Sequence, residues 1–261
     1  MILQGKSNTI QIIKKSGRKR IQKSFSKKLR MYDVFWPISR FEVECFTHKL
    51  VSEFAKDDCY FHQPAFISSD NSKKILTLEY IDAQPLMSFF KCSTHVGANA
   101  SADALYPFML PTKKQFSNLI SILHKINHYS FDTFSEYEKA LLRNQDEIVR
   151  CMYHNKLKDQ VCPLTKPPWY FCLGDVSLNN ILFDGKQFTL LDFECAHMGY
   201  LGYDIGQLLG MTIAHEKQSA MIADHMFSQN LLQAITETIS DSNELSEIFI
   251  WANRFERYYF I

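Results

Sequence analysis

The feature that most constrains this chain is a short apolar hairpin with polar residues at both of its ends. Two apolar runs, ILF at 181–183 and QFTLL at 187–191, flank the dipeptide Asp184-Gly185. Asp-Gly readily takes the positive φ angles of a tight turn, so the two runs are predicted to pair as antiparallel strands. The residue before the first strand and the residue after the second then lie at the same end of the hairpin.

Polar side chains occur at that end. Asn180 precedes the first strand, and Asp192 follows the second. Asp175 lies one short loop away, because the apolar run 169–173 is predicted to be a buried strand from which Gly174 gives a sharp exit. We therefore expect three oxygen-bearing side chains to converge at one rim.

The types and order of these residues favour metal-dependent phosphate chemistry. Carboxylate and amide oxygens are hard ligands that suit Mg²⁺ better than Zn²⁺. The order Asp-x₄-Asn, apolar hairpin, Asp-Phe is the one used in kinase phosphoryl transfer, where the first Asp accepts a hydroxyl proton and the other two residues hold the metal. A turn rich in Asp and Asn would explain these residues singly but not their order.

Composition sets the class of protein. Hydrophobic residues make up 46% of the 261 residues and charged residues 22%, which is typical of a soluble globular protein with ample material for a core. The formal net charge of +1 gives no argument for nucleic acid or membrane as a partner. No signal sequence and no membrane-spanning stretch is expected. The seven scattered cysteines, none in a CxxC pair, favour reduced thiols in the cytoplasm.

Patterning along the chain predicts an α+β protein with two lobes. The first lobe, 1–82, would hold a small sheet and one helix, and the second, 83–261, would be mostly helical. The expected strands of the first lobe are 9–13 and 19–25 around a Ser16-Gly17 turn, and 74–81; its helix is 40–55. The polar composition of 91–114 predicts a loop or insertion. The expected helices of the second lobe are 115–129, about 134–157, 203–215, 217–239 and 243–259.

The stretch GDVSLNNILFDG followed by LLDFECAHMGYLGYDIGQLL resembles the aminoglycoside phosphotransferase and choline kinase family, which has a protein-kinase-like fold. Gly199 and Asp204-Ile205 match the end of the family motif. The resemblance is specific over 172–208 and topological elsewhere. It implies ATP, or alternatively GTP, and Mg²⁺ as cofactors. It also implies that Asp175 is the catalytic base and that Asn180 and Asp192 are the metal ligands.

Two positions depart from the family pattern. The family usually has His two positions before the catalytic Asp, where this chain has Leu173, and many members have His where this chain has Ser177. The first His supports the loop and does not take part in the chemistry. The departure therefore concerns loop geometry more than activity.

A kinase-like first lobe should supply a lysine for the nucleotide phosphates. Alternation along 19–25 places Lys23 on an inward face between two apolar neighbours, where a charge needs a partner or a ligand. An edge-strand lysine that reaches solvent is the alternative. Glu42 on the following helix is the preferred partner of Lys23, and Glu44 is the second choice.

Two further segments resemble nucleotide-binding parts of the family. GKSN contains Ser7 and Asn8 and resembles a shortened phosphate loop, although it has one glycine. LTLEYI resembles the hinge, where Glu79, Tyr80 and Ile81 would read the adenine through their backbone. An ordinary core strand is equally compatible with that pattern.

The function predicted from these features is transfer of the γ-phosphate of ATP to a hydroxyl of a small molecule or saccharide. Aminoglycoside, choline-like amine, amino-acid alcohol and sugar all stay open as acceptors, because acceptor pockets have no sequence code. A catalytically inactive kinase-like binding module is one alternative. A protein kinase is another, but only eleven positions separate Asp192 from Tyr203, which leaves little room for an activation segment.

Three other patterns have ordinary explanations. The basic stretch 14–30 is interpreted as a solvated strand face and not as a nucleic-acid site. His124 and His128 lie four positions apart on a predicted helix, but HKINH lacks the Glu of a zinc-protease helix, which favours packing or surface exposure. The acidic residues of the C-terminal helices are interpreted as a solvated face: Glu237, Asp241, Glu244 and Glu247.

Overall fold

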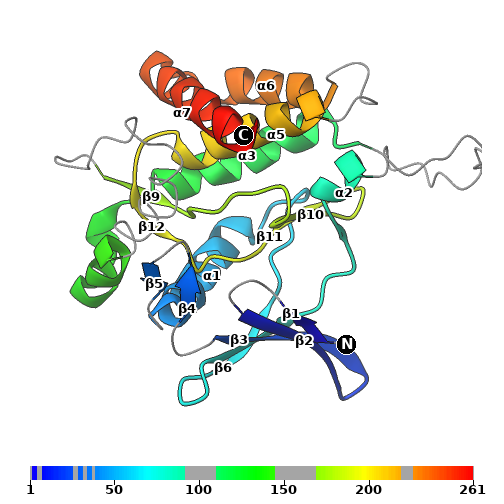
Figure 1. Ribbon diagram of the computed structural model, residues 1–261, viewed down its shortest axis with the longest axis vertical. Helices are drawn as coiled ribbons and strands as arrows, with labels where there is room; N and C mark the ends of the chain where they lie inside the picture. Colours follow the sequence, from blue (N-terminus) through cyan, green and yellow to red (C-terminus); the bar gives the residue numbers. More distant parts are fainter. Residues whose placement is uncertain are drawn as a thin grey trace, which may run out of the picture.

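The structure is a computed structural model and describes residues 2–4, 8–25, 29–31, 34–36, 39–91, 110–144, 169–218 and 226–260. It has the predicted α+β architecture with a small antiparallel sheet and a larger helical lobe. Figure 1 shows the blue strands near the N-terminus at one end of the molecule and the helices α5, α6 and α7 stacked at the other. Helix α1 lies between them.

The sheet of the small lobe has five strands in the order β1-β2-β3-β7-β6. Ser16 and Gly17 form its first turn with φ angles of 52° and 77°, the left-handed values that a tight hairpin needs. The hairpin prediction is confirmed, although the strands run longer than expected. The strands are β1 (Ile2–Gln4), β2 (Asn8–Lys15), β3 (Arg18–Phe25), β6 (Phe66–Asp70) and β7 (Ile75–Glu79).

Helix α1 (Arg40–Ala55) has the predicted bounds and packs on this sheet. Phe25 and Phe41 meet edge to face with ring centroids 5.3 Å apart and form a small core with Leu76 and Leu78. Lys23 pairs in register with Ile10 and Leu76, and its own side chain is buried. The strand therefore turns Lys23 toward α1, as its alternation predicted.

The helical lobe consists of long amphipathic helices around one large core. Helix α3 begins with a capping box in which Thr112 and Gln115 satisfy each other's backbone groups. Helices α5 and α7 approach closely at Gly210, where a larger residue would not fit. A Cβ added there would stand 2.3 Å from the carbonyl oxygen of Ala252. The helices are α2 (Met87–Lys91), α3 (Lys113–Asn127), η2 (Phe131–Thr133), α5 (Tyr203–Gln218), α6 (Met226–Thr238) and α7 (Ser242–Phe260).

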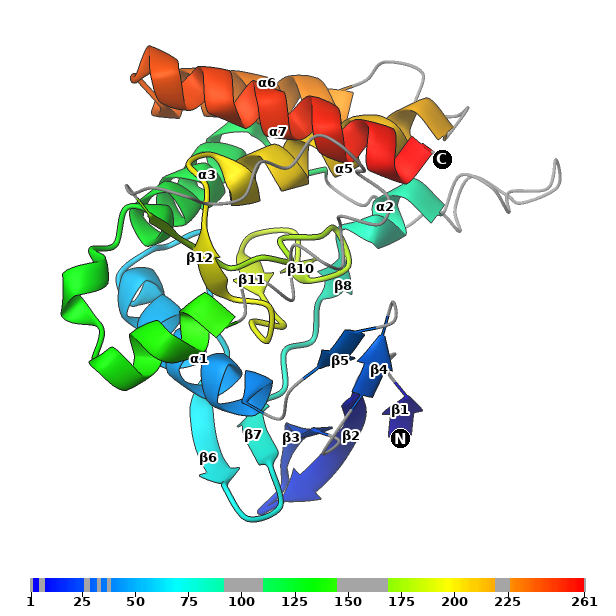
Figure 2. The same cartoon turned by 60° about the vertical axis from the view of Figure 1, so that its left-hand side comes forward.

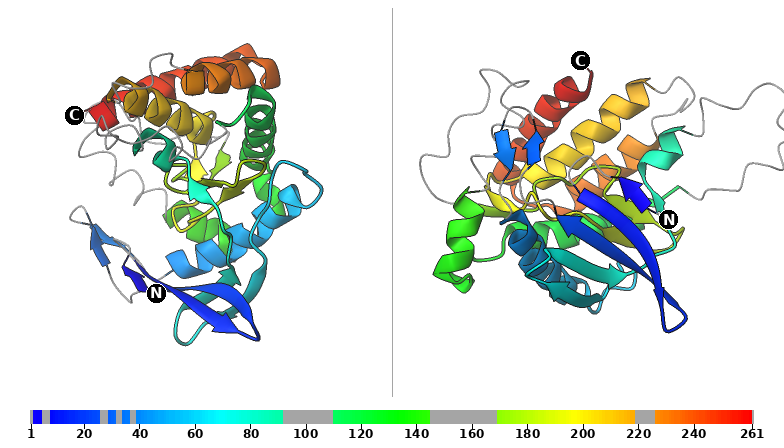
Figure 3. Two further views of the ribbon diagram at one scale, coloured as in Figure 1. Left: turned by 90° about the vertical axis from the view of Figure 1, so that its right-hand side faces the viewer. Right: turned by 60° about the horizontal axis from the view of Figure 1, so that its bottom comes forward.

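Short strands lie between the two lobes, and the left view of Figure 3 shows this yellow to yellow-green part of the chain between the helices and the small sheet. The predicted Asp184-Gly185 hairpin is confirmed, with φ of 95° at Gly185. The amide of Leu191 donates to the carbonyl oxygen of Asn180 at 2.8 Å, so the two ends of the hairpin meet. The strands are β8 (Gln84–Pro85), β9 (Tyr170–Cys172), β10 (Ile181–Phe183), β11 (Phe188–Leu190) and β12 (His197–Gly199); a separate pair is β4 (Leu29–Met31) and β5 (Val34–Trp36).

Some predicted bounds differ from the observed ones or fall outside the described residues. Strand β7 ends two residues before the predicted 81, because the chain leaves the sheet there for the helical lobe. Residues 136–144 are helical, as predicted. The rest of that predicted helix, most of the insertion 91–114 and the start of the helix predicted at 217–239 lie outside the described residues. No described helix is long and apolar enough to cross a membrane.

Candidate active site

The loop that carries Asp175 is held by side chains of the helical lobe. The carboxylate of Asp204, in the first turn of α5, accepts hydrogen bonds from the backbone amides of Leu173 at 2.7 Å and Gly174 at 3.0 Å. Gln207 accepts one from the amide of Val176 at 2.8 Å. These bonds fix the loop on both sides of Asp175, although Leu173 stands where the family usually has His.

Helix α3 also helps to hold the loop that carries Asp175. The side-chain amide of Asn127 donates to Asp204 at 2.7 Å and to the carbonyl oxygen of Phe171 at 2.8 Å. Asp204 is fully buried, and burial raises the pKa of its carboxyl despite the hydrogen bonds from Gly174 and Leu173. Three donors on one buried acid make Asp204 the anchor of the loop.

Gly174 is required by the close approach of another chain segment. Its φ is +83°, and an added Cβ would lie 2.2 Å from the carbonyl oxygen of Cys195 and 2.8 Å from Nδ1 of His197. A larger residue at position 174 would be disfavoured by the positive φ and would collide with these atoms. The sharp exit predicted at this position is therefore present.

Asp175 and Asn180 are in direct contact, as their spacing predicted. Nδ2 of Asn180 donates to Oδ2 of Asp175 at 2.9 Å and to the carbonyl oxygen of the same residue at 3.1 Å. Burial, followed by the charge of Asp192, raises the pKa of the Asp175 carboxyl to about 7. A carboxyl with a pKa near neutrality is suited to accept a proton during a reaction.

Asp192 is held by a lysine of the small lobe. Nζ of Lys23 contacts Oδ1 of Asp192 and lies 3.1 Å from Oε2 of Glu44 and 3.7 Å from Oε2 of Glu194. Burial alone would lower the pKa of Lys23, but the charges of Asp192, Glu194 and Glu44 more than offset it and raise the pKa well above its usual value. Lys23 is therefore a fixed cation that links the small lobe to the rim of the hairpin.

The preferred pairing of Lys23 with Glu42 is wrong, and Glu44 is the partner on α1. Two positions along a helix correspond to about 200°, so Glu42 and Glu44 point to nearly opposite sides. Glu44 shares the buried face with Phe41 and His48, whereas Glu42 is half-buried. Glu42 instead accepts hydrogen bonds from Lys74 at 3.1 Å and from the hydroxyl of Tyr137.

The backbone at Asp192 is unusual for a residue other than glycine. Its φ is +65°, in the left-handed region, which Asp tolerates better than most residues but still at a cost. Burial raises the pKa of its carboxyl, and the charge of Lys23 works in the opposite direction. Strained backbone beside a partly buried ion pair is typical of functional sites.

A second buried cation, which the sequence did not single out, completes this region. Nε of Arg40 lies 3.3 Å from Oε2 of Glu194, and Arg40 also donates to Oδ1 of Asn8 at 3.2 Å. Nδ2 of Asn8 donates to Glu194 at 2.7 Å. Two features of the sequence could have indicated this ion pair: the acidic Glu194, two positions after Asp192, and Arg40 at the start of α1. Phosphate binding by Asn8 stays a prediction, and Ser7 lies outside the described residues.

The predicted hinge residues end the last inner strand of the small sheet. The backbone of Glu79 pairs with Arg20 in register, and its amide donates to the carbonyl oxygen of Ala65 at 3.0 Å. Nζ of Lys19 lies 4.8 Å from the centre of the Tyr80 ring. Figure 2 shows the chain running from β7 toward β8 and so from one lobe to the other. Adenine recognition by residues 79–81 stays a prediction.

Comparison with known proteins finds one family model that matches part of the chain. The sequence profile of the phosphotransferase enzyme family matches residues 118–236, which include Asp175, Asn180 and Asp192. The predicted family resemblance is confirmed. The assignment as a phosphotransferase-type enzyme with an alcohol group as acceptor agrees with this match. A comparison with curated protein sequences gives no match.

Solved structures share the fold of this phosphotransferase-like chain. A choline/ethanolamine kinase family protein from Mesorhizobium loti is 14% identical with a TM-score of 0.53, and the match covers 99% of this chain and 76% of the other. Ethanolamine kinase from Plasmodium vivax is 11% identical with a TM-score of 0.53, covering 99% of this chain and 72% of the other. These likenesses confirm the two-lobed kinase-like fold.

Proposed function

We propose that this protein transfers the γ-phosphate of ATP, or alternatively GTP, to a hydroxyl group of a small molecule or saccharide. The observation that carries the proposal is the different bonding of the two acids at one rim. Asp175 is bonded to the amide of Asn180, whereas Asp192 contacts the ammonium of Lys23. One acid is thus arranged to accept a proton, and the other lies among fixed charges.

The side chains at the rim fit a divalent cation. Asn180 and Asp192 offer an amide oxygen and a carboxylate, the ligand types that Mg²⁺ prefers. Nδ2 of Asn180 faces Asp175, so the amide oxygen points away from that residue. In Asp192 it is Oδ1 that Lys23 contacts. Bound Mg²⁺ supplies charge neutralisation for the phosphate oxygens.

The remaining residues have positioning roles in this proposal. Lys23 would lie against the nucleotide phosphates and Glu44 would hold it, while residues 79–81 would contact the adenine. Asp175 would orient the acceptor hydroxyl and take its proton as the bond to phosphorus forms. Helix α5 begins at Tyr203, soon after Asp192, which supports a small acceptor over an extended peptide.

A phosphate-transfer screen tests the proposal. Purified protein is incubated with Mg²⁺, γ-labelled ATP or GTP, and separate pools of aminoglycosides, amino alcohols and sugars. We expect label in one pool of hydroxyl compounds with the wild type and with Asp132→Asn, a control change at an exposed residue of η2. Asp175→Asn should transfer little.

Each contrary outcome has a defined meaning. Label on a protein substrate with none on small hydroxyl compounds would establish a protein kinase. Absence of transfer, combined with no Mg²⁺-dependent thermal stabilisation by either nucleotide, would establish an inactive binding module, since a ligand of the native state must raise its stability.

A further inference from the structure

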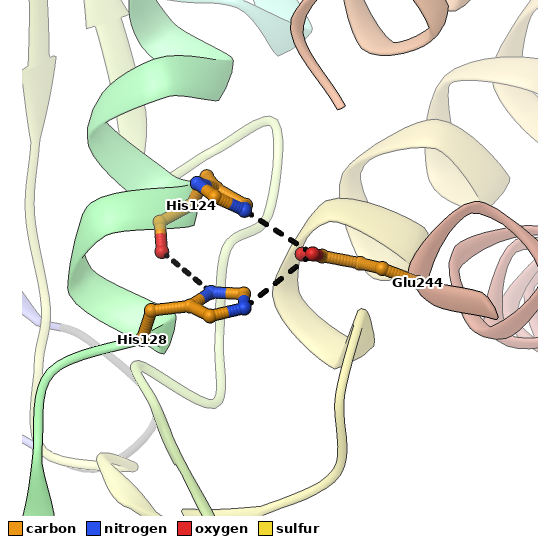
Figure 4. Close-up of side chains that lie close together, drawn as sticks. All are labelled: His124, His128 and Glu244. Carbon is orange, nitrogen blue, oxygen red and sulfur yellow. Dashed lines mark hydrogen bonds and ion pairs between the residues drawn. The ribbon is translucent and has the colours of Figure 1, made fainter. Parts of the chain in front are cut away.

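A second cluster of ligating side chains lies away from the rim, between α3 and α7. His124 lies in the last turn of α3, His128 is the residue that caps the C-terminal end of that helix, and Glu244 comes from the first turn of α7. Figure 4 shows both imidazole rings directed at the Glu244 carboxylate. Nε2 of His124 lies 3.1 Å from Oε2 of Glu244, and Nε2 of His128 lies 3.4 Å from the same oxygen.

Hydrogen bonding fixes the protonation of one ring nitrogen. Nδ1 of His128 lies 3.1 Å from the carbonyl oxygen of His124, and a carbonyl can only accept. Nδ1 of His128 therefore carries a hydrogen, and in the neutral ring the lone pair is on Nε2, facing Glu244. A lone pair and a carboxylate oxygen repel each other unless a cation lies between them. A proton or a metal ion can fill that role.

The spacing of the ligand atoms fits a metal ion. Tetrahedral Zn²⁺ with bonds of about 2.1 Å separates its ligand atoms by about 3.4 Å. The two nitrogen–oxygen distances are 3.1 and 3.4 Å, and the three ligand atoms all lie within 4.8 Å of one another. Small movements of the two partly exposed imidazole rings would complete the geometry.

The environment of Glu244 gives an independent argument. Its side chain is only 4% exposed, and its Oε1 is buried without a hydrogen bond to any described residue. A buried carboxylate with an unsatisfied oxygen is costly unless positive charge compensates it. The side chains of His124 and His128 are 35% and 40% exposed, so an ion can reach Glu244 from solvent.

We propose that His124, His128 and Glu244 bind one divalent transition-metal ion, with Zn²⁺ as the best match to two imidazoles and a carboxylate. A water molecule would complete the coordination. The site is distinct from the Mg²⁺ site at the rim and joins α3 to α7. Because Asn127, next to His128, holds Asp204, the ion would brace the helix that supports the Asp175 loop.

Zinc titration of the full chain, treated with chelator and kept reduced, tests the proposal. The measurements are calorimetric stoichiometry and affinity, with the thermal midpoint as a second readout. We expect the wild type to bind one equivalent and to gain thermal stability. The double variant His124→Gln, His128→Gln should bind at least about 100-fold more weakly, since even partners outside the ligand set change affinity 10- to 100-fold.

Two further variants sharpen the result. His62 also faces one carboxylate, with Nε2 3.4 Å from Glu79, but no third ligand joins this pair among the described residues, so His62→Gln should bind Zn²⁺ like the wild type. His128→Gln alone changes an exposed ring and should weaken binding without unfolding the protein. It serves as the decisive variant if the double change impairs folding.

Two outcomes would overturn the proposal. One is equal Zn²⁺ affinity in the wild type and in His128→Gln, which would assign any binding to other groups such as the thiols. The other is no saturable binding by the wild type up to about 0.1 mM Zn²⁺, a concentration that detects even weak sites. The cluster would then be an ion pair between protonated imidazoles and Glu244.

Discussion

Asp175 and Asp192 lie at one rim, but different lobes hold them. The loop at Asp175 is fixed by Asp204 and Gln207, both on α5 of the helical lobe. Asp192 is fixed by Lys23 of the small lobe. A shift of one lobe against the other would move the partner of Asp192 and leave the Asp175 loop in place. Under the proposed function, acceptor activation and phosphate positioning would therefore have separate supports.

Removing Asp192 should have the largest effect on turnover, because it takes away the proposed metal ligand and the partner of Lys23 together. We expect Asp192→Ala to lower turnover by about 10³-fold or more. The turnover assay uses the acceptor found in the screen, with Asp132→Asn as control. Normal turnover of Asp192→Ala would break the comparison, since Asp192 would then have no special role.

Replacing Asp175 should have the next largest effect and should act through chemistry. Asp175→Asn keeps the shape of the side chain but removes the basic oxygen, and we expect kcat to fall about 10²-fold or more, the scale of general-base loss. The loop should keep its position, because its anchor is Asp204. Unchanged kcat would show that Asp175 is not the base.

A matched pair on α1 tests the small-lobe side of the comparison. Glu44→Gln weakens the buried pair with Lys23 and should lower kcat/KM about tenfold, less than the loss expected from a full 1 Å misplacement. Glu42→Gln lies on the other side of the helix and should stay within about twofold of the wild type. A larger effect of Glu42→Gln would reverse the assignment made from the structure.

The pH dependence of stability tests a contact between the two lobes without a turnover assay. His48 on α1 connects the lobes, because Nε2 donates to the carbonyl oxygen of Pro64 at 2.6 Å and Nδ1 accepts from Gln63, which also donates to Leu190 of the hairpin. Both ring nitrogens are thus satisfied in the neutral form. Burial is the main reason that the pKa of His48 is lowered to about 4.

The direction in which stability changes with pH follows from proton binding. Between pH 6.5 and 4 the unfolded chain takes up a proton at His48 that the folded protein does not, so the unfolding free energy falls as pH falls, by up to about 3 kcal/mol. Asp175 and Glu44, with pKa values raised to about 7 mainly by burial, act in the opposite direction. The useful measurement is therefore the Tm of the wild type minus that of His48→Gln. This difference should shrink from pH 7 to pH 4.5, and parallel curves would contradict it.

Local sequence signals predicted the parts of the fold that depend on short-range chemistry. Ser16-Gly17 and Asp184-Gly185 determine their turns through backbone preferences, which a sequence displays directly. The contact between Asp175 and Asn180 was predictable for the same reason, because a five-position spacing closes within one loop. The inward direction of Lys23 followed from strand alternation.

Features that depend on the packing of distant segments were not predictable. Glu42 and Glu44 both precede apolar residues, and only the docking of α1 on the sheet decides which of them faces Lys23. The pairing of Arg40 with Glu194 joins residues far apart in the chain. Glu244 was interpreted as part of a solvated face, because nothing in the sequence places it opposite His124.

Calorimetric binding of Mg²⁺ with ATP to Asp175→Asn and Asp192→Asn tests the central claim most directly. If Asp175 is the base and Asp192 a metal ligand, Asp175→Asn should bind the nucleotide within about threefold of the wild type, while Asp192→Asn should lose at least about tenfold in affinity, or 1.4 kcal/mol. Without Mg²⁺ the difference should disappear. Equal loss of binding in the two variants would contradict the assignment of separate roles to the two acids.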